Sequence, residues 1–175
     1  CATPELARNG GEALRLFEGL GARDLQTILG AERQKQLLGA CREDALACSV
    51  DHLAEPGDYY EYRAGWLSIL VVRGSDGQLR AFQNTCRHRG NAICQGTGAG
   101  LTELRCPYHR WAWTTEGRLR EVPSRKGFGV LDNDEYALIP AQVDTWGRLV
   151  FVNADIDAMP LSEWLEGIPE DVASF

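Results

Sequence analysis

Two short motifs, Cys86-Arg-His88 and Cys106-Pro-Tyr-His109, constrain the fold of this chain more than any other feature of its sequence. Each motif offers one thiol and one imidazole, and seventeen residues separate the two motifs. Strand-like segments flank both motifs, so each motif is expected in a loop beside a sheet. Two such loops on one side of a sheet bring four metal ligands together. We therefore expect Cys86, His88, Cys106 and His109 to bind a metal.

The order of the ligands distinguishes two kinds of metal site. Two Cys and two His can hold a tetrahedral zinc ion, but zinc motifs usually place the cysteines on one loop and the histidines on the other. In a [2Fe–2S] cluster with mixed ligands, one iron takes both thiolates and the other takes both imidazoles, so each loop supplies one ligand to each iron. The alternating order here favours the diiron cluster, and a structural zinc module remains an alternative.

The sequence around the motifs indicates a mainly β fold, a small antiparallel sandwich or barrel-like domain over residues 50–158. Asp76-Gly77 is a hairpin signal between two apolar runs, and Trp146-Gly147 is expected at the turn of a second hairpin. We expect strands at 66–73, 78–82, 101–105, 111–114, 136–143 and 148–153.

The two flanks of this domain look different from its centre. Apolar residues recur at intervals of three to four over residues 12–46, which predicts short helices, and we assign residues 1–49 to an N-terminal helical segment. A second short helix is predicted after Pro160, with Ser162 as a candidate cap, in the segment 159–175.

Charge and apolar runs exclude several classes of function. The net charge of −7 argues against general binding of nucleic acid, and no run approaches the ~20 apolar residues that span a membrane. The first thirty residues contain no continuous apolar stretch typical of a secretory signal. With only six cysteines and no signal, a cytoplasmic protein with reduced thiols is expected.

The motifs and their context resemble the Rieske domain of the large (α) subunit of aromatic-ring-hydroxylating oxygenases. The resemblance rests on Cys86-Arg-His-Arg-Gly90, Cys106-Pro-Tyr-His109-x-Trp111 and Gly147-x-Leu-Val-Phe-Val-Asn153, and it covers about residues 50–165. It implies that Cys86 and Cys106 bind one iron. It also implies that His88 and His109 bind the outer, redox-active iron through their Nδ1 atoms.

The same resemblance implies a function in electron transfer. A ferredoxin or reductase would deliver single electrons to the cluster. The electrons would cross a subunit boundary in a trimer to a mononuclear Fe(II), where O₂ is activated to oxidise an aromatic or related substrate. Rieske proteins of cytochrome bc complexes carry an extra cysteine in each loop, and the second loop here has none. A stand-alone Rieske ferredoxin remains the second interpretation.

The chain holds too few histidines for the whole reaction. A mononuclear iron of this kind needs two His and one carboxylate, and the sequence has three histidines, of which His88 and His109 are assigned to the cluster. The remaining His52 is expected at the surface. Because the chain also begins at Cys1, we expect a fragment, in which residues 159–175 begin the connection to a missing catalytic domain.

Several neighbours of the ligands have expected roles. Residues 80–126 carry nine Arg or Lys and three Glu, a net of +6, which leaves −13 for the rest of the chain. We expect Arg89 and Arg105 to brace the two loops and Arg110 to contact an acidic electron donor. One of Trp111 and Trp113 is expected in the core, and the other is expected to shield the cluster from water.

Overall fold

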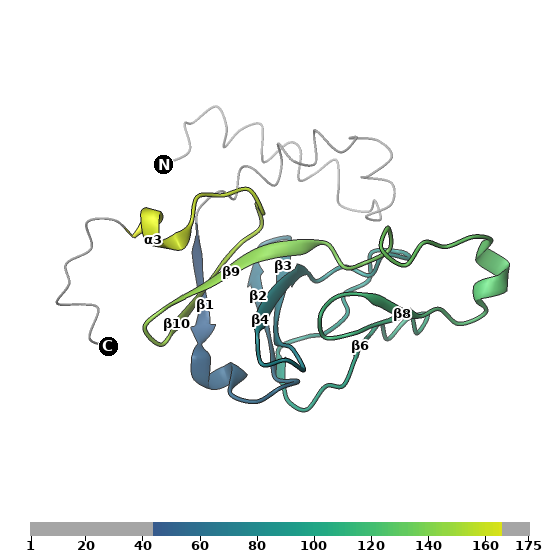
Figure 1. Ribbon diagram of the computed structural model, residues 1–175, viewed down its shortest axis with the longest axis horizontal. Helices are drawn as coiled ribbons and strands as arrows, with labels where there is room; N and C mark the ends of the chain where they lie inside the picture. The colour runs from purple at the N-terminus through teal and green to yellow at the C-terminus, as the bar shows by residue number, and fades with distance from the viewer. Residues whose placement is uncertain (1–43, 166–175) are drawn as a thin grey trace.

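A computed structural model describes residues 44–165 of the chain as two antiparallel β-sheets (Figure 1). The larger sheet has seven strands in the order β1-β10-β9-β4-β3-β2-β5, and the smaller sheet has the order β6-β7-β8. The predicted mainly β fold is confirmed. In Figure 1 the smaller sheet lies toward one end of the larger one, beside the segment that follows β8.

The elements are short, as is usual for a small β domain. Their bounds are β1 Ala45–Ser49, the 3₁₀ turn η2 Val50–Leu53, β2 Tyr59–Ala64, β3 Leu67–Arg73, β4 Leu79–Gln83, β5 Thr97–Gly98, β6 Leu104–Arg105, β7 Ala112–Trp113, β8 Leu119–Glu121, the 3₁₀ turn η3 Arg125–Phe128, β9 Pro140–Trp146, β10 Leu149–Asn153 and α3 Leu161–Trp164.

Strand β3 lies between two hydrophobic cores, which explains the unbroken apolar run over residues 69–72. Leu70 and Val72 pack into the core that also contains Cys86 and Cys106. The alternate side chains of β3, among them Ile69 and Val71, pack into a second core with β10. Because successive side chains of a strand point to opposite faces, a strand covered on both faces must be apolar at nearly every position.

The two predicted hairpins are present. β3 pairs with β4 across the Asp76-Gly77 turn, and β9 pairs with β10 with Trp146 opposite Leu149. Strands β1 and β2 were not predicted. Each residue of β2 taken as a whole is half-buried or exposed, and its sequence lacks the apolar alternation that marks a strand.

Two predictions in the flanks need correction. Residues 45–49, assigned to the N-terminal helical segment, form β1 instead, because they pair with β10 at the edge of the larger sheet. The rest of that helical prediction lies outside the described residues. Helix α3 is present after Pro160, but Pro160 occupies its N-cap position and no side chain caps it, so Ser162 is not the cap.

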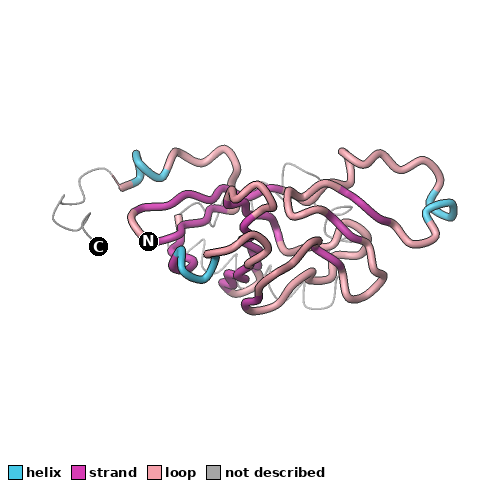
Figure 2. Tube along the Cα trace, turned by 60° about the horizontal axis from the view of Figure 1, so that its bottom comes forward, coloured by secondary structure: helices cyan, strands magenta, loops and turns pink. Residues whose placement is uncertain are grey.

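Strands β4 and β9 are neighbours in the larger sheet although they lie far apart along the chain. Ala81 of β4 lies opposite Ala141 of β9, and Phe82 lies opposite Pro140. The residues between them carry both ligand motifs, the smaller sheet and also β5, which pairs with β2 at the edge of the larger sheet. Most of this segment is loop rather than strand (Figure 2). No helix among residues 44–165 is long and apolar enough to cross a membrane.

Candidate iron–sulfur centre

The two ligand loops have the same backbone hydrogen bonds. In the first loop the Cys86 N–H donates to the carbonyl five residues later at 2.8 Å, and the Cys86 carbonyl accepts from the N–H four residues later at 2.8 Å. In the second loop Cys106 makes the same two bonds at 2.9 and 3.1 Å. Each cysteine is therefore fixed at the start of a closed turn that also carries its histidine.

Both turns close through a left-handed residue four places after the cysteine. Gly90 has a φ of 72° in the first loop, and Arg110 has a φ of 65° in the second. Glycine adopts this conformation without a steric penalty, which suits Gly90 to the closing position of the turn. Arg110 carries a Cβ into the same conformation, which the sequence did not predict.

The two thiols lie side by side in the core. Cys86 and Cys106 are 3% and 1% exposed, and their side chains are hydrogen-bonded to each other. Burial raises the pKa of the Cys86 thiol to about 11, and the Cys106 thiol raises it further, although N–H groups of His88 and Arg89 donate to the Cys86 sulfur and lower it. A bound cation would remove this obstacle to ionisation, because metal binding displaces thiol protons.

The two imidazoles lie side by side nearer the surface. The ring centroids of His88 and His109 are 4.6 Å apart, and both residues are half-buried. His88 stacks on Trp111 with ring centroids 5.1 Å apart and an interplanar angle of 4°. The ring centroids of His109 and Tyr108 are 3.7 Å apart. The indole plane of Trp111 thus limits how the His88 ring can turn.

The arrangement of the four side chains in two pairs fits a diiron cluster better than one zinc ion. A tetrahedral ion needs its four ligands around one point. No group of three or more His, Cys, Asp or Glu side chains within residues 44–165 is arranged to hold a single metal ion. A thiol pair in the core and an imidazole pair toward the surface are the donor sets that the two irons of a mixed-ligand cluster require.

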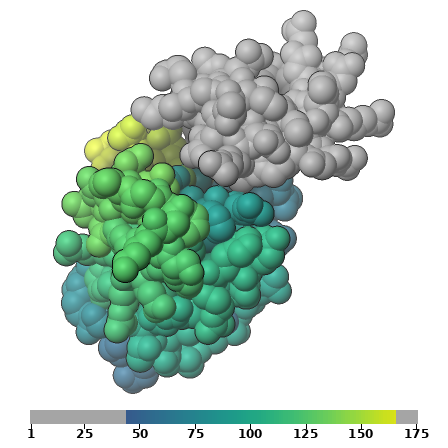
Figure 3. All heavy atoms as spheres, turned by 90° about the vertical axis from the view of Figure 1, so that its right-hand side faces the viewer, coloured from purple at the N-terminus to yellow at the C-terminus, as the bar shows by residue number. Residues whose placement is uncertain are grey.

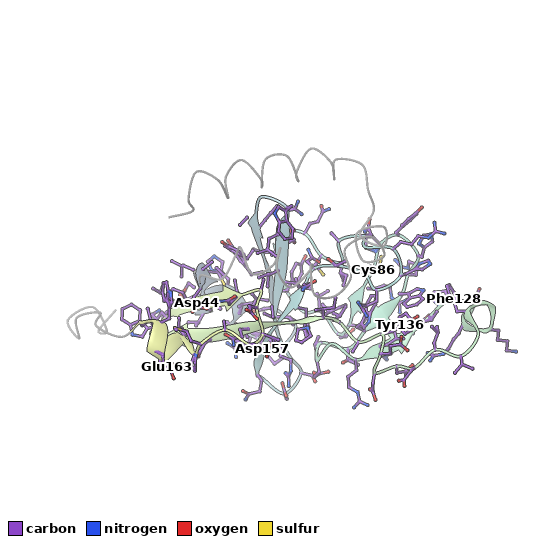
Figure 4. The ribbon with its side chains drawn as sticks, turned by 90° about the horizontal axis from the view of Figure 1, so that it is seen from above. Asp44, Cys86, Phe128, Tyr136, Asp157 and Glu163 are labelled. Carbon is purple, nitrogen blue, oxygen red and sulfur yellow. The ribbon has the colours of Figure 1, made fainter. Side chains whose placement is uncertain are left out.

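The segment between β8 and β9 covers the histidine side of the site. The ring centroid of Phe128 lies 5.5 Å from that of His88 and 5.4 Å from that of Trp111, and both ring pairs are edge-on. Arg87 donates a hydrogen bond from Nη2 to the Glu135 carbonyl. Figure 3 looks onto this end of the molecule, where the segment is drawn in green in front of the teal loops. In Figure 4, Cys86, Tyr136 and Phe128 lie together at this end.

Both tryptophans of the second loop region are buried; Trp113 lies in the core, as predicted for one of the two, and Trp111 stacks on the candidate ligand His88. Trp111 is 2% exposed and Trp113 is fully buried. Trp113 donates from its indole N–H to the Tyr136 carbonyl at 2.9 Å. Trp111 also contacts His88, so one residue both packs in the core and covers a candidate ligand.

The arginines divide into bracing and solvent-facing residues. Arg105 donates to the Arg110 carbonyl at 3.0 Å and forms ion pairs with Glu103 and Glu121, so its predicted bracing role is confirmed. Arg89 is exposed, and within residues 44–165 no hydrogen bond or ion pair of its guanidinium is found, so the prediction that it braces a loop is wrong. Arg110 is exposed as well.

A buried polar network supports the first loop from behind. Asn84 is 3% exposed, and its side-chain oxygen accepts from the N–H groups of Ile93 and Cys94 at 2.9 and 3.2 Å. Its amide nitrogen donates to the Cys94 carbonyl and to Ser68. Sequence reasoning did not assign Asn84 this role, because contacts over such separations leave no local pattern.

Cys94 and His52 do not belong to the four-residue candidate site. Cys94 packs against the first core, and burial raises the pKa of its thiol to about 11. His52 is exposed and lies edge-on to Tyr60, in line with its expected surface position. The other cysteines assigned to the N-terminal segment, Cys1 and Cys41, lie outside the described residues.

Comparison with known proteins gives one family match and several similar proteins. A model of the Rieske [2Fe-2S] domain matches residues 44–146. The α subunit of benzene 1,2-dioxygenase from Pseudomonas putida is 37% identical over 115 residues, which are 65% of this chain and 26% of that protein. The oxygenase subunit of carnitine monooxygenase from Escherichia coli K12 is 34% identical over 116 residues, which are 66% of this chain and 31% of that protein.

A solved structure shares the fold. The crystal structure of a quaternary ammonium Rieske monooxygenase with L-carnitine superposes with a TM-score of 0.72 at 28% sequence identity. The match covers 82% of this chain and 40% of that one. The chain thus spans about a quarter to two-fifths of the length of these similar proteins.

Proposed function

This chain belongs to the Rieske [2Fe-2S] domain family, and on that premise we propose that it is the electron-entry domain of a ring-hydroxylating oxygenase large subunit. The observation that carries the proposal is the pairing of a buried Cys86–Cys106 thiol pair with a half-buried His88–His109 imidazole pair. The similar benzene dioxygenase and carnitine monooxygenase subunits support the oxygenase assignment.

We propose that Cys86 and Cys106 hold one iron and that His88 and His109 hold the other. The bound cluster supplies one-electron chemistry. The two cysteines would anchor it in the core, where N–H groups of the first loop already point at the Cys86 sulfur. Such hydrogen bonds to sulfur disperse negative charge and favour the reduced state.

The side chains on the histidine side would control access to the cluster. Trp111 excludes water from one face of His88, and Phe128 covers ring edges of both residues. His109 is half-buried beside the exposed Tyr108. These two imidazoles are therefore the shortest path between the buried cluster site and a protein docked at this end.

The partners follow from the same proposal. A ferredoxin or reductase would donate single electrons. A neighbouring subunit of a trimer would receive them at a mononuclear Fe(II) in a domain that follows residue 175, and it would oxidise an aromatic or related substrate. Residues 50–158 would be the Rieske domain and 159–175 the start of the connection. The solved structure of a quaternary ammonium Rieske monooxygenase of similar fold gives insight into inter-subunit electron transfer in that protein, which supports the same route here.

A cytoplasmic location is also part of the proposal. Cys48, Cys86, Cys94 and Cys106, the cysteines among the described residues, all carry free thiols. Free thiols at these positions are typical of a reducing compartment. A stand-alone Rieske carrier is the second candidate, and it is favoured only if no catalytic domain accompanies the chain.

Low-temperature EPR of the dithionite-reduced protein tests the proposal. Iron and acid-labile sulfide are counted on the same sample. A rhombic signal typical of mixed His and Cys ligation, with two irons per chain, is the expected result. A silent spectrum with one zinc per chain would overturn it and leave a zinc-stabilised binding module.

A further inference from the structure

An arginine occupies a backbone position in the second ligand loop that glycine occupies in the first. Gly90 and Arg110 each lie four residues after a candidate cysteine ligand, and the N–H of each donates to the carbonyl of that cysteine. Their φ values are 72° and 65°. A side chain in this conformation brings Cβ close to the backbone, and glycine avoids that cost. The backbone geometry of the loop therefore does not explain why residue 110 is an arginine.

Internal contacts of the side chain do not explain it either. The hydrogen bonds found for Arg110 are made by its main chain, to the Cys106 carbonyl and from Arg105. Arg105 braces the loop and is itself held by Glu103 and Glu121. Within the described part of the chain the Arg110 guanidinium forms no ion pair, and the residue is exposed. The hydrogen bond from Arg105 is the largest cause that lowers the pKa of the exposed Glu121 carboxyl, and the charge of Arg110 contributes to the same lowering.

A second guanidinium in the first loop has the same surroundings. Arg89 directly follows His88 as Arg110 directly follows His109, and it is also exposed with no ion pair to any residue from 44 to 165. Arg87 differs, because its guanidinium donates back to the Glu135 carbonyl. Each candidate histidine ligand is thus followed by one solvent-facing arginine.

We propose that Arg89 and Arg110 are a docking pair for an acidic protein surface, that of the one-electron donor, and that they hold it against the edges of His88 and His109. The inference rests on the proposed function and adds the contact residues. One electron leaves the donor as one enters the cluster, so the step needs no further reactant.

Charge on the rest of the chain makes the docking selective. Residues 80–126 carry a net charge of +6, and the remainder of the chain carries −13. An acidic donor is repelled over most of the surface and attracted at the ligand loops. Attraction over about 8 Å at physiological salt orients the donor before contact.

The experiment measures the second-order rate of electron transfer into the oxidised holo-protein by stopped flow. The probe is a reduced, acidic, plant-type [2Fe–2S] ferredoxin, at low salt and at ~0.5 M salt. Arg110→Asn removes the charge with a residue that tolerates the left-handed backbone, and Arg110→Lys keeps the charge. Arg118→Asn is the matched control, because Arg118 is exposed on the turn between β7 and β8 and does not follow a candidate histidine ligand.

We expect Arg110→Asn to lower the rate about three- to tenfold at low salt, with the difference lost at high salt. Arg110→Lys and Arg118→Asn should stay close to the wild type, and Arg89→Asn should behave as Arg110→Asn does. The reduction potential is measured for each variant. A potential shift large enough to account for the slower rate would overturn docking as the role of Arg110.

Arg110→Gly separates a docking role from a structural one. Relief of the left-handed strain should raise Tm by a few degrees, while the loss of charge lowers the rate. A residue that only supports the loop would move both quantities in the same direction. Equal rates for Arg110→Asn and the wild type, with two irons bound in each, would reject the docking pair and leave the electron-entry function standing. Absence of a cluster in the wild type would instead reject the function itself.

Discussion

At the scale of single residues, the candidate site is asymmetric in its exposure to solvent. The thiols of Cys86 and Cys106 lie in the core, whereas the imidazoles of His88 and His109 reach the half-exposed end. Charge is costly in the core and is tolerated near water. The thiol side is therefore suited to permanent attachment of a cationic metal centre, and the imidazole side to exchange with partners.

Loss of one thiol should remove the metal centre. Cys106→Ala leaves Cys86 without its partner in an apolar surrounding, so we expect iron and sulfide to fall to a small fraction of wild-type values. Cys48→Ala is the control, because Cys48 is a buried thiol in the other core. Metal analysis and visible absorbance measure the result. Full cluster absorbance in Cys106→Ala would remove this cysteine from the ligand set.

Phe128 should affect the cluster through the His88 ring. Phe128→Ala opens the ring edges of His88 and Trp111 to water. Water stabilises the more highly charged reduced state, so the potential should rise, by less than the ~59 mV that corresponds to a tenfold change for one electron. Val130→Ala, on the same segment and fully exposed, is the control. Redox titration followed by EPR measures the shift, and an unchanged potential would assign Phe128 to packing alone.

At the scale of elements, a buried carboxylate connects β2 to the segment behind the first loop. Glu61 accepts from Ser68 at 2.7 Å and from the Gly96 N–H at 2.9 Å, and Asn84 donates to it at 3.3 Å. Its side chain is 8% exposed. Burial raises the pKa of Glu61, but hydrogen bonds from Gly96, Arg63 and Ser68 outweigh it and lower the pKa to about 2.

This carboxylate predicts a specific dependence of stability on pH. Because its pKa is lower in the folded than in the unfolded chain, Glu61 contributes its full stabilisation above about pH 4.3, the ordinary pKa of Glu, and loses it as pH falls toward 2. Glu61→Gln should lower the free energy of unfolding at pH 7 by about 2 kcal/mol and have little effect near pH 2. Denaturant unfolding at several pH values measures this, with the exposed Glu55→Gln as control. A pH-independent effect would assign the loss to packing.

Features that depend on local sequence signals could be predicted, whereas features that depend on contacts between distant residues could not. The ligand loops could be placed because residue type and spacing carry coordination chemistry, and β3, β4, β9 and β10 because apolar runs and turn residues are local signals. Strand β1 could not be placed, since its residues are held by pairing with β10, about a hundred positions away. The left-handed Arg110 was missed for the same reason, because its conformation follows from a bond to Cys106 and not from its own preference.

At the scale of the whole molecule, the proposed cluster site is one of the two iron sites that ring hydroxylation requires. The sequence has three histidines, and the exposed His52 lies beside Tyr60, away from the His88–His109 pair. A site of two histidines and one carboxylate cannot be assembled from the one that remains. The chain should therefore accept electrons without oxidising a substrate.

That expectation is tested with the 175-residue chain itself. Loaded with cluster and supplied with a reductase, an acidic ferredoxin and benzene, it should be reduced and reoxidised by O₂ with no hydroxylated product. The matched control is a complete benzene dioxygenase under the same conditions. Product formed by this chain alone, detected by mass spectrometry, would show that it is a full oxygenase and would contradict the electron-entry assignment.

Because β4 and β9 are neighbours in the larger sheet, the end that carries the ligand motifs is largely an insertion between them. Residues 84–139 begin and end beside hydrogen-bonded neighbours, and among them only β5 belongs to the larger sheet, so the parts other than β5 can change in length and content without altering the order of its strands. Closing a loop of this length costs roughly 3–4 kcal/mol of chain entropy, and the cost grows only logarithmically with added residues. Evolution can therefore lengthen the segment that reaches toward a partner, or exchange its tip, at little cost in stability. An engineer could graft the ligand loops onto another antiparallel pair by the same two attachment points.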